Sequence, residues 1–281
     1  MLPWYIADEV ILRALKEDVH YLDVSCEYLF DAHHKSEAQL LAKAPGVMCG
    51  GELFLRVFAL LDPACQGEIF VKDGNSFERG DILLRVEGPA AVLLQGERTA
   101  LNLLQHLCGV AAATAELVRA VEGTGAVVSE TRKTLPGLRA LQKYAVACGG
   151  GRNHRYNLSD AIMLKDNHID ACGSIAEAVA AVRAKAGHML KIEVETRDLD
   201  EVRAALEAGA DVIMLDNMTT EQMREASAYV DKRAILEASG DITIENAREA
   251  AETGVDIISV GAITHSVQAA NISMRILCAG A

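Results

Sequence analysis

The pattern of hydrophobic and polar positions changes near residue 125. Beyond it, short apolar runs recur, and each is followed by a polar residue and then a helical stretch. This alternation predicts parallel strands joined by right-handed crossovers. Six units favour an incomplete (β/α) barrel over an open sheet. The predicted strands are 126–129, 161–164, 190–194, 211–215, 233–236 and 256–260, and the predicted helices include 174–185, 199–208, 221–230 and 243–253.

The first hundred residues mix short strands and helices without that alternation. Apolar spacing predicts helices at 8–18 and 52–61 and strands at 39–43, 68–72 and 82–87. Two further helices, 90–106 and 110–121, are expected to meet near Gly109. We therefore expect an α+β module over residues 1–108 and a barrel over 109–265. The segment from about 266 to 281 is expected to pack back on the first module.

Composition narrows the class of protein. The 281 residues carry a net charge of −13, which argues against nucleic-acid binding and membrane binding. The most apolar stretch, 90–107, is interrupted by polar residues, and the chain start lacks the pattern of a secretory signal. Seven cysteines form no Cys-x-x-Cys pair, so we expect small core residues in a reducing cytoplasm instead of a disulfide frame or a zinc site.

One window has the opposite charge to the rest of the chain. Residues 127–168 contain seven Lys/Arg and three Asp/Glu, a local balance of +4, and glycines punctuate them. A solvated basic surface is the simpler interpretation, but these cations alternate with glycines and apolar residues instead of forming a run. The window therefore indicates a site for a small anion.

Charged side chains also follow the predicted strands. In a parallel barrel the loops at the carboxyl ends of the strands meet on one rim, where chemistry gathers. Arginine forks and a histidine suit carboxylates, lysines suit a phosphate or a transition-state anion, and two acids suit ribose hydroxyls or Mg²⁺. The residues that follow strands are Thr131, Arg132, Lys133, Lys165, Glu195 and Asp216, and the carboxylate-binding candidates His154 and Arg155 of the basic window complete this predicted set of eight.

Two glycine turns follow the last two predicted strands. Glycine lets backbone N–H groups approach a ligand closely, and a helix start supplies further unpaired donors. Phosphate sites in barrels commonly use these two loops. The turns predicted to bind phosphate are Ser239-Gly240-Asp241 and Val260-Gly261-Ala262, the second followed by His265.

Several longer motifs resemble the quinolinate phosphoribosyltransferase family, also called nicotinate-nucleotide pyrophosphorylase (carboxylating). The resemblance covers most of the chain, and its motifs are long. They are GERTALN (96–102), TRKTLPGLR (131–139), KYAV (143–146), GGGRNHR (149–155), LKDNH (164–168), EVE (193–195), LDN (215–217), EASG (237–240) and SVG (259–261). Asp241 departs from the family pattern, in which a second glycine is common.

The resemblance implies a type II phosphoribosyltransferase with an N-terminal α/β sandwich and an incomplete barrel. It implies transfer from phosphoribosyl pyrophosphate to quinolinate with decarboxylation, Mg²⁺ and no organic cofactor, in a homodimer or an assembly of dimers. By analogy Arg98 reaches the neighbour's site, and Arg132, His154, Arg155 and Lys165 bind the two carboxylates. Lys133 and Lys165 line the reacting centre, Glu195 and Asp216 hold ribose and Mg²⁺, and the two glycine turns take the 5′-phosphate.

Two other functions remain open at this point. One is a related pyrophosphorylase of molybdenum-transport operons, which would use a different acceptor; the intact Lys165-Asp166-Asn167-His168 favours quinolinate. The other is a non-catalytic protein that binds phosphorylated ligands. The presence of both acids and both lysines argues against it.

Overall fold

The structure is a computed structural model that describes residues 2–31 and 34–277. The chain forms two compact units. The first comprises Met1–Ala115, Thr134–Gly150 and Ile263–Ala281, and the second comprises Glu116–Lys133 and Gly151–Ala262. The first unit therefore draws on three separate stretches of sequence. One of them, 134–150, lies within the stretch that the hydrophobic pattern had assigned to the barrel.

The first unit is built on an antiparallel sheet with the order β12-β1-β5-β3. Its strands are β1 (Lys35–Ala42), β3 (Gln66–Ile69), β5 (Ile82–Pro89) and β12 (Ile272–Leu277), and a separate pair is formed by β2 (Gly46–Val47) and β4 (Ser76–Phe77). Burial alternates along β1 and β5, so one face of the sheet is covered. Because β12 pairs with β1, the end of the chain returns to this unit; Cys278 and the residues after it lie outside the described part.

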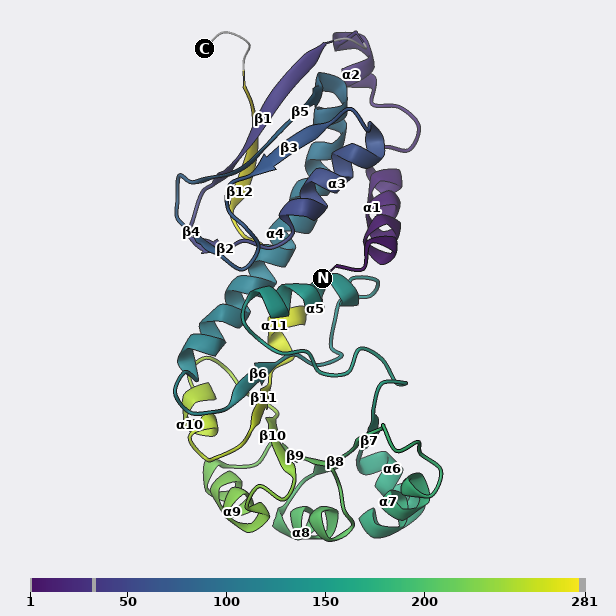
Figure 1. Ribbon diagram of the computed structural model, residues 1–281, viewed down its shortest axis with the longest axis vertical. Helices are drawn as coiled ribbons and strands as arrows, with labels where there is room; N and C mark the ends of the chain where they lie inside the picture. The colour runs from purple at the N-terminus through teal and green to yellow at the C-terminus, as the bar shows by residue number, and fades with distance from the viewer. Residues whose placement is uncertain (1, 32–33, 278–281) are drawn as a thin grey trace. The chain divides into compact units, whose positions relative to one another are not determined.

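Helices complete the core of the first unit (Figure 1). In α3 (Gly51–Leu61) the buried residues Leu53, Phe54, Val57 and Phe58 recur at helical spacing, and α3 contacts both β3 and α1. The remaining helices that do not connect strands of the parallel sheet described below are α1 (Trp4–Asp18), α2 (Val24–Leu29), α4 (Ala90–Ala120), α5 (Arg139–Cys148) and α11 (Ala262–His265).

Helix α4 corrects the prediction of two helices joined near Gly109. It runs without interruption for 31 residues. A Cβ atom at Gly109 would lie 2.2 Å from the carbonyl oxygen of Gln268, so the glycine permits a close backbone approach instead of ending a helix. Contrary to our reading of 90–107, α4 is long and apolar enough to span a membrane; half of its most apolar stretch is buried in the protein, as in many core helices.

The second unit contains a six-stranded parallel sheet with the order β6-β11-β10-β9-β8-β7. Figure 1 shows the strands as an arc with α8, α9 and α10 outside it. The strands are β6 (Val127–Ser129), β7 (Ile162–Leu164), β8 (Ile192–Thr196), β9 (Val212–Asp216), β10 (Ile235–Ser239) and β11 (Ile257–Ser259). The helices are α6 (Asp166–Cys172), α7 (Ile175–Arg183), α8 (Leu199–Glu207), α9 (Thr220–Val230) and α10 (Ala247–Ala251).

In the described residues β6 and β7 are the edges of this sheet, so the barrel is incomplete. The edge at β6 is extended by the segment after α5. Ser129 and Arg152 form an isolated parallel bridge, and the Arg152 N–H donates to the carbonyl of Val128 at 2.8 Å. This pairing fixes the backbone two residues before His154.

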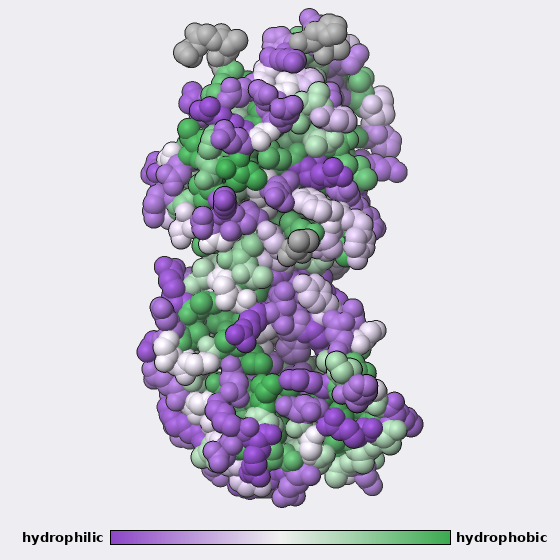
Figure 2. All heavy atoms as spheres, in the orientation of Figure 1, coloured by the Kyte–Doolittle hydropathy of each residue, from purple (hydrophilic) through white to green (hydrophobic). Residues whose placement is uncertain are grey.

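Alternate residues of the strands face opposite sides of the sheet. The side toward the helices is apolar, and Val194, Ile213, Leu215 and Ala238 are completely buried. Hydrophilic side chains predominate on the outer surface of α8 and α9, at the bottom of Figure 2. The opposite side of the sheet carries polar residues, among them Glu193 and Glu237. The same side also carries the buried Met214, so the interior of this barrel is partly polar and partly apolar.

Candidate functional site

A cavity of about 560 Å³ lies at the carboxyl ends of the strands of the second unit. Most of its lining is charged or polar. It includes cations of the basic window 127–168 and the acids at the ends of β8 and β9. The lining residues are Thr131, Arg132, Lys133, His154, Arg155, Met163, Lys165, Glu195, Met214, Asp216, Asn217, Glu237, Ser239, Gly240 and Asp241.

The cavity brings together most of the residues that the sequence singles out. All eight residues of the predicted strand-end set and the whole turn 239–241 line it. Val260, Gly261 and Ala262 follow β11 and do not line it, and the Val260 N–H instead donates to the carbonyl of Ser129 at 2.9 Å. Arg98 and His265 belong to the first unit. The second phosphate turn and the role of Arg98 stay predictions.

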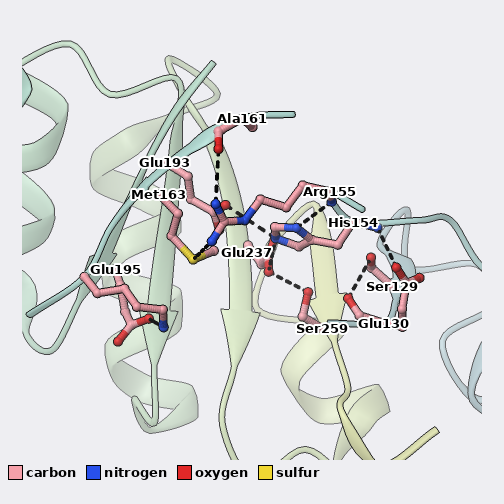
Figure 3. Close-up of polar contacts among 11 residues, drawn as sticks. Ser129, Glu130, His154, Arg155, Ala161, Met163, Glu193, Glu195, Glu237 and Ser259 are labelled. Carbon is pink, nitrogen blue, oxygen red and sulfur yellow. Dashed lines mark hydrogen bonds and ion pairs between the residues drawn. The ribbon is translucent and has the colours of Figure 1, made fainter. Parts of the chain in front are cut away.

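His154 is held inside the barrel by two acids from different strands. Its Nε2 lies 3.4 Å from Glu193 Oε2 and 3.4 Å from Glu237 Oε1 (Figure 3). Both glutamates are at most 5 % exposed. Ser259 donates its hydroxyl to Glu237 Oε1 at 2.5 Å, and the backbone N–H of His154 donates to Glu130 Oε1 at 3.1 Å. Side chains of β8 and β10 therefore contact the imidazole, and Glu130, which follows β6, holds the backbone of His154.

The two acids set the protonation of this cluster. Burial alone would lower the pKa of His154, but hydrogen bonds and attraction from Glu193 and Glu237 outweigh it and raise that pKa to about 10. Burial raises the pKa of Glu193, as does repulsion from Glu237. In the ring orientation assigned here, the backbone N–H of Arg155 donates to His154 Nδ1 at 2.8 Å, so the proton on Nε2 is the one directed at the two acids.

The same three side chains place donor atoms within 4.8 Å of one another, as a metal site would. His154 Nε2, however, already lies 3.4 Å from a carboxylate oxygen of each glutamate, so the imidazole itself serves as their partner. The guanidinium of Arg155 also lowers the pKa of Glu193, so it lies close enough to compete with a cation. The His154 cluster is therefore an internal ion-pair network.

Two arginines give the cavity its anion-binding character. Arg155 donates to the carbonyl of Ala161 at 3.1 Å and to Met163 Sδ at 3.3 Å, which orients the guanidinium. Burial lowers the pKa of Arg155, and repulsion from Arg132 lowers it further. Arg132 Nε is buried and has no hydrogen-bond partner among the described residues. A carboxylate bound between the two arginines would relieve both conditions.

The opposite wall carries the two predicted acids. Lys165 Nζ forms an ion pair with Glu195 Oε2. Figure 3 shows Glu195 apart from His154 and its two glutamates. Asp216 ends β9 and accepts from Asn217 Nδ2 at 3.0 Å. Because β8 and β9 are neighbours in the sheet, both carboxylates stand on the same rim. Hard oxygen donors of this kind fit Mg²⁺.

The turn after β10 has an unusual backbone. Gly240 has φ +91°, and a Cβ atom there would lie 2.2 Å from Asn217 Oδ1, so the position requires glycine. Asp241 has φ +47°, in the left-handed region that favours glycine. The sequence resemblance predicts a second glycine at this position. A positive φ explains that preference, because glycine adopts it without strain. Asn246 Nδ2 donates to the Asp241 carbonyl at 3.0 Å and supports the turn.

Some lining residues were given no role at the sequence level. They are Met163, Met214, Asn217 and Glu237, and Glu193 lies just beneath them. A signal was present: Glu193 stands two residues before Glu195, and Glu237 two residues before Ser239, so each pair shares one face of a strand. Applying that period to the strands, and not only to their ends, would have found both acids.

The fold and the cavity define a class of protein: a (β/α)-barrel enzyme whose strand-end site gathers acidic and phosphorylated small molecules. Residues 23–108 match the profile of the quinolinate phosphoribosyl transferase N-terminal domain, and residues 110–275 match that of its C-terminal domain. Together the two profiles cover most of the chain. The chain belongs to the quinolinate phosphoribosyltransferase family.

Individual relatives agree with this assignment. The chain is 44% identical over 260 residues to a probable nicotinate-nucleotide pyrophosphorylase [carboxylating] of Bacillus subtilis, covering 92% of this chain and 90% of the relative. It is 42% identical over 274 residues to the Mycobacterium leprae enzyme of that name, covering 95% and 96%. The crystal structure of NadC from Streptococcus pyogenes superposes with a TM-score of 0.95 at 42% identity and covers 99% of this chain and 98% of that one.

Proposed function

We propose that this chain transfers the phosphoribosyl group of phosphoribosyl pyrophosphate to quinolinate, with loss of CO₂, to give nicotinate mononucleotide and pyrophosphate. The similarity to carboxylating nicotinate-nucleotide pyrophosphorylases supports this activity. One observation in the cavity carries it: two arginines and a histidine stand together at its floor, and Arg132 Nε is buried without a partner. This is a site for a dianionic acid, such as a pyridine dicarboxylate.

The two substrates would occupy opposite sides of the cavity. Quinolinate carboxylates would bind Arg132, His154 and Arg155, with Lys165 reaching the same ligand. Lys133 and Lys165 would face the reacting atoms. The 5′-phosphate would take backbone N–H groups of the turn 239–241 and of the second turn at 260–262, with His265 nearby in sequence. Binding both substrates in one oriented complex removes much of the entropic barrier.

Glu195 and Asp216 would hold the ribose hydroxyls and Mg²⁺. The donor set fits the ion, since both groups are carboxylates on the cavity rim. When bound, Mg²⁺ would neutralise pyrophosphate oxygens as negative charge develops on them. Glu195 is paired with Lys165 in this structure, so binding of the sugar or ion would exchange that partner.

The chemistry needs little from the protein beyond placement and charge. The ring nitrogen of quinolinate forms a bond to the anomeric carbon while the bond from that carbon to pyrophosphate breaks. The resulting pyridinium then takes up the electron pair of the bond between C2 and its carboxylate, CO₂ departs, and a proton replaces it at C2. Fixed cations around the ring favour these steps electrostatically.

The proposed oligomer is a homodimer, or an assembly of dimers, and the proposed location is the cytoplasm. Arg98 stands in the motif 96–102 and lies in the first unit, in the N-terminal third of α4. We assign it to the active site of a neighbouring copy, where it would add a further cation for quinolinate. Nucleic acid and membranes have no part in this proposal, and no organic cofactor is required.

A substrate panel tests the proposed function. Purified protein is given phosphoribosyl pyrophosphate, Mg²⁺ and either quinolinate, nicotinate or a pyrimidine carboxylic acid, and CO₂ and nucleotide products are measured. We expect CO₂ and nicotinate mononucleotide from quinolinate alone. Turnover of another acid without CO₂ from quinolinate would favour the pyrophosphorylase of molybdenum-transport operons. Tight binding of phosphoribosyl pyrophosphate without any turnover would favour a non-catalytic binding protein.

A further inference from the structure

A second cluster of reactive side chains lies in the first unit, outside the cavity described above. One donor atom each from Cys49, Asp73 and Cys148 lie within 4.8 Å of one another. The three residues are far apart in sequence: Cys49 precedes α3, Asp73 follows β3, and Cys148 is the last residue of α5. The proposed function uses none of them.

Asp73 is held in a fixed orientation. Its Oδ2 accepts from the Gly50 N–H at 2.8 Å and from the Tyr144 hydroxyl at 2.8 Å, and its Oδ1 accepts from the Gly51 N–H at 3.0 Å. A carboxylate offers about four acceptor positions, so these three bonds leave one. Metal-binding carboxylates are commonly oriented by hydrogen bonds of this kind.

The two thiols differ in their surroundings. Cys49 is completely buried, whereas Cys148 is partly exposed. A hydrogen bond with Cys49 lowers the pKa of Cys148 and outweighs burial, which raises it. Burial raises the pKa of Cys49 well above its ordinary value. The Cys148 sulfur is therefore on the side of the cluster that is nearer to solvent, and the Cys49 sulfur is enclosed by the protein.

A third cysteine, Cys108, forms hydrogen bonds with the backbone of Cys49. Cys108 Sγ accepts from the Cys49 N–H at 3.3 Å and donates to the Cys49 carbonyl at 3.5 Å. Burial raises the pKa of Cys108 to about 12. Cys108 therefore stays a thiol that fixes the Cys49 backbone, and it supplies no ligand.

We propose that Cys49, Asp73 and Cys148 bind one thiophilic divalent cation of the Zn²⁺ type, with a fourth position open to water. In such sites the metal lies about 2.3 Å from sulfur and about 2.0–2.2 Å from oxygen, so small side-chain rotations close the cluster. Both thiols lose their protons on binding, and no oxidation state changes. Sulfur donors exclude Mg²⁺, so this site is separate in chemistry from the one at Glu195 and Asp216.

The bound ion would join the start of α3 to the end of α5. Cys148 is followed directly by the segment 149–155, which carries His154 and Arg155. Holding the end of α5 would therefore fix one end of the segment that leads into the cavity. The expected consequence is a higher melting temperature of the Zn²⁺-loaded protein.

Cobalt provides a direct probe of the site. Protein that has been reduced and treated with a chelator is titrated with Co²⁺. We expect thiolate-to-metal charge-transfer absorption that saturates at one ion per chain and is abolished by Zn²⁺ but not by Mg²⁺. Cys49→Ser and Cys148→Ser should lose the absorption, and Cys65→Ser, a partly exposed cysteine of the same unit, should keep it. Absorption retained by Cys148→Ser, or none in the wild-type protein, would overturn the proposal.

A second measurement avoids substitutions that affect folding. Wild-type protein is alkylated with iodoacetamide with and without Zn²⁺, and labelled peptides are counted by mass spectrometry. Zn²⁺ should protect Cys148 at least tenfold and leave the exposed Cys172 unchanged. Equal labelling of Cys148 in both samples would contradict the proposal. So would a Cys49–Cys148 disulfide that forms in air, with dissolved oxygen as oxidant, at the same rate with and without Zn²⁺.

Discussion

His154 Nε2 lies 3.4 Å from Glu237 Oε1, inside a barrel where an apolar layer is usual. Glu237 is 2 % exposed, and Ser259 donates to the same oxygen. The pair therefore does two things at once. It neutralises a buried acid, and it holds a proposed carboxylate-binding imidazole at the floor of the cavity.

Replacing Glu237 by Gln should change the pH dependence of stability. The pKa of His154 is raised from 6.5 to about 10, so its contribution is complete below pH 6.5 and is lost as pH rises through about 10. The raised pKa of Glu193 acts in the same direction. Urea unfolding of the wild-type protein should thus show stability falling between pH 6.5 and pH 10, with a flatter profile in Glu237→Gln.

The matched variants are Glu193→Gln and Ser259→Ala. The first should flatten the same pH profile, and the second should leave most of it intact because both acids remain. Truncation of one acid to Ala should cost about 1–3 kcal/mol, since it removes one polar partner of a buried imidazole while the second acid remains. Identical pH profiles for the wild-type protein and both Gln variants would show that His154 is neutral in the folded state.

Lys133→Ala and Lys165→Ala should each lower turnover by about 10²–10³-fold, the usual effect of removing one group that stabilises charge in a transition state. The Lys165 side chain is 46 % exposed, so its loss should leave the fold intact. The measurement is CO₂ release at saturating substrates, with thermal melting as the control. Near-wild-type turnover for both variants would show that Lys133 and Lys165 do not line the reacting centre.

The turn after β10 gives a prediction about phosphate binding. Gly240→Ala would place a Cβ atom 2.2 Å from Asn217 Oδ1 at φ +91°, so we expect a displaced turn and a KM for phosphoribosyl pyrophosphate raised at least tenfold. Gly209→Ala is the matched control: its φ is +80°, but nothing lies within 4 Å of the added atom. Gly209→Ala should cost stability alone, by about 1 kcal/mol. Equal KM values for the two variants would contradict the assignment of this turn.

Asp241 offers the opposite change. Asp241 lines the cavity within the turn proposed to bind phosphate, so removing its negative charge should lower the KM for phosphoribosyl pyrophosphate. Asp241→Asn removes the charge and keeps a residue that tolerates φ +47°, whereas Asp241→Gly also relieves the backbone. Steady-state kinetics should show a similar decrease in both. A decrease confined to Asp241→Gly would assign the effect to the backbone instead.

The shared-site proposal is tested by mixing inactive subunits. Arg98→Ala and Lys165→Ala proteins are combined, and CO₂ release is followed after subunit exchange has been verified by mass-tagged chains. A mixed dimer contains one site free of both changes, so part of the activity should return. Absence of recovery in verified mixed dimers would place Arg98 outside the neighbour's site.

The sequence predicted the barrel well because its strands are short apolar runs in a regular βα alternation. It failed at α4, where Gly109 was taken as a break although a neighbouring carbonyl, invisible in sequence, explains the glycine. It also predicted the helix 243–253 too long at both ends; the observed α10 is Ala247–Ala251, after a turn in which the Thr243 N–H donates to Asn246 Oδ1.

The same limit applies to the site. Charges at strand ends could be read from the chain, and Arg132, Lys165, Glu195 and Asp216 line one cavity. Glu193 and Glu237 were passed over because the strands had been treated as apolar core. Only the structure shows that the barrel interior is partly polar. The cysteine spacing had predicted against a zinc site, whereas Cys49, Asp73 and Cys148 come together from three elements with no motif spacing.

The central claim is that one cavity at the strand ends gathers the dicarboxylate beside the activated sugar. A crystal structure of the protein with quinolinate and a non-reactive analogue of phosphoribosyl pyrophosphate tests it most directly. The account predicts the quinolinate carboxylates on Arg132, His154 and Arg155, with the 5′-phosphate on the Ser239-Gly240 turn. Both ligands bound elsewhere, with Arg132 Nε still lacking a partner, would contradict it.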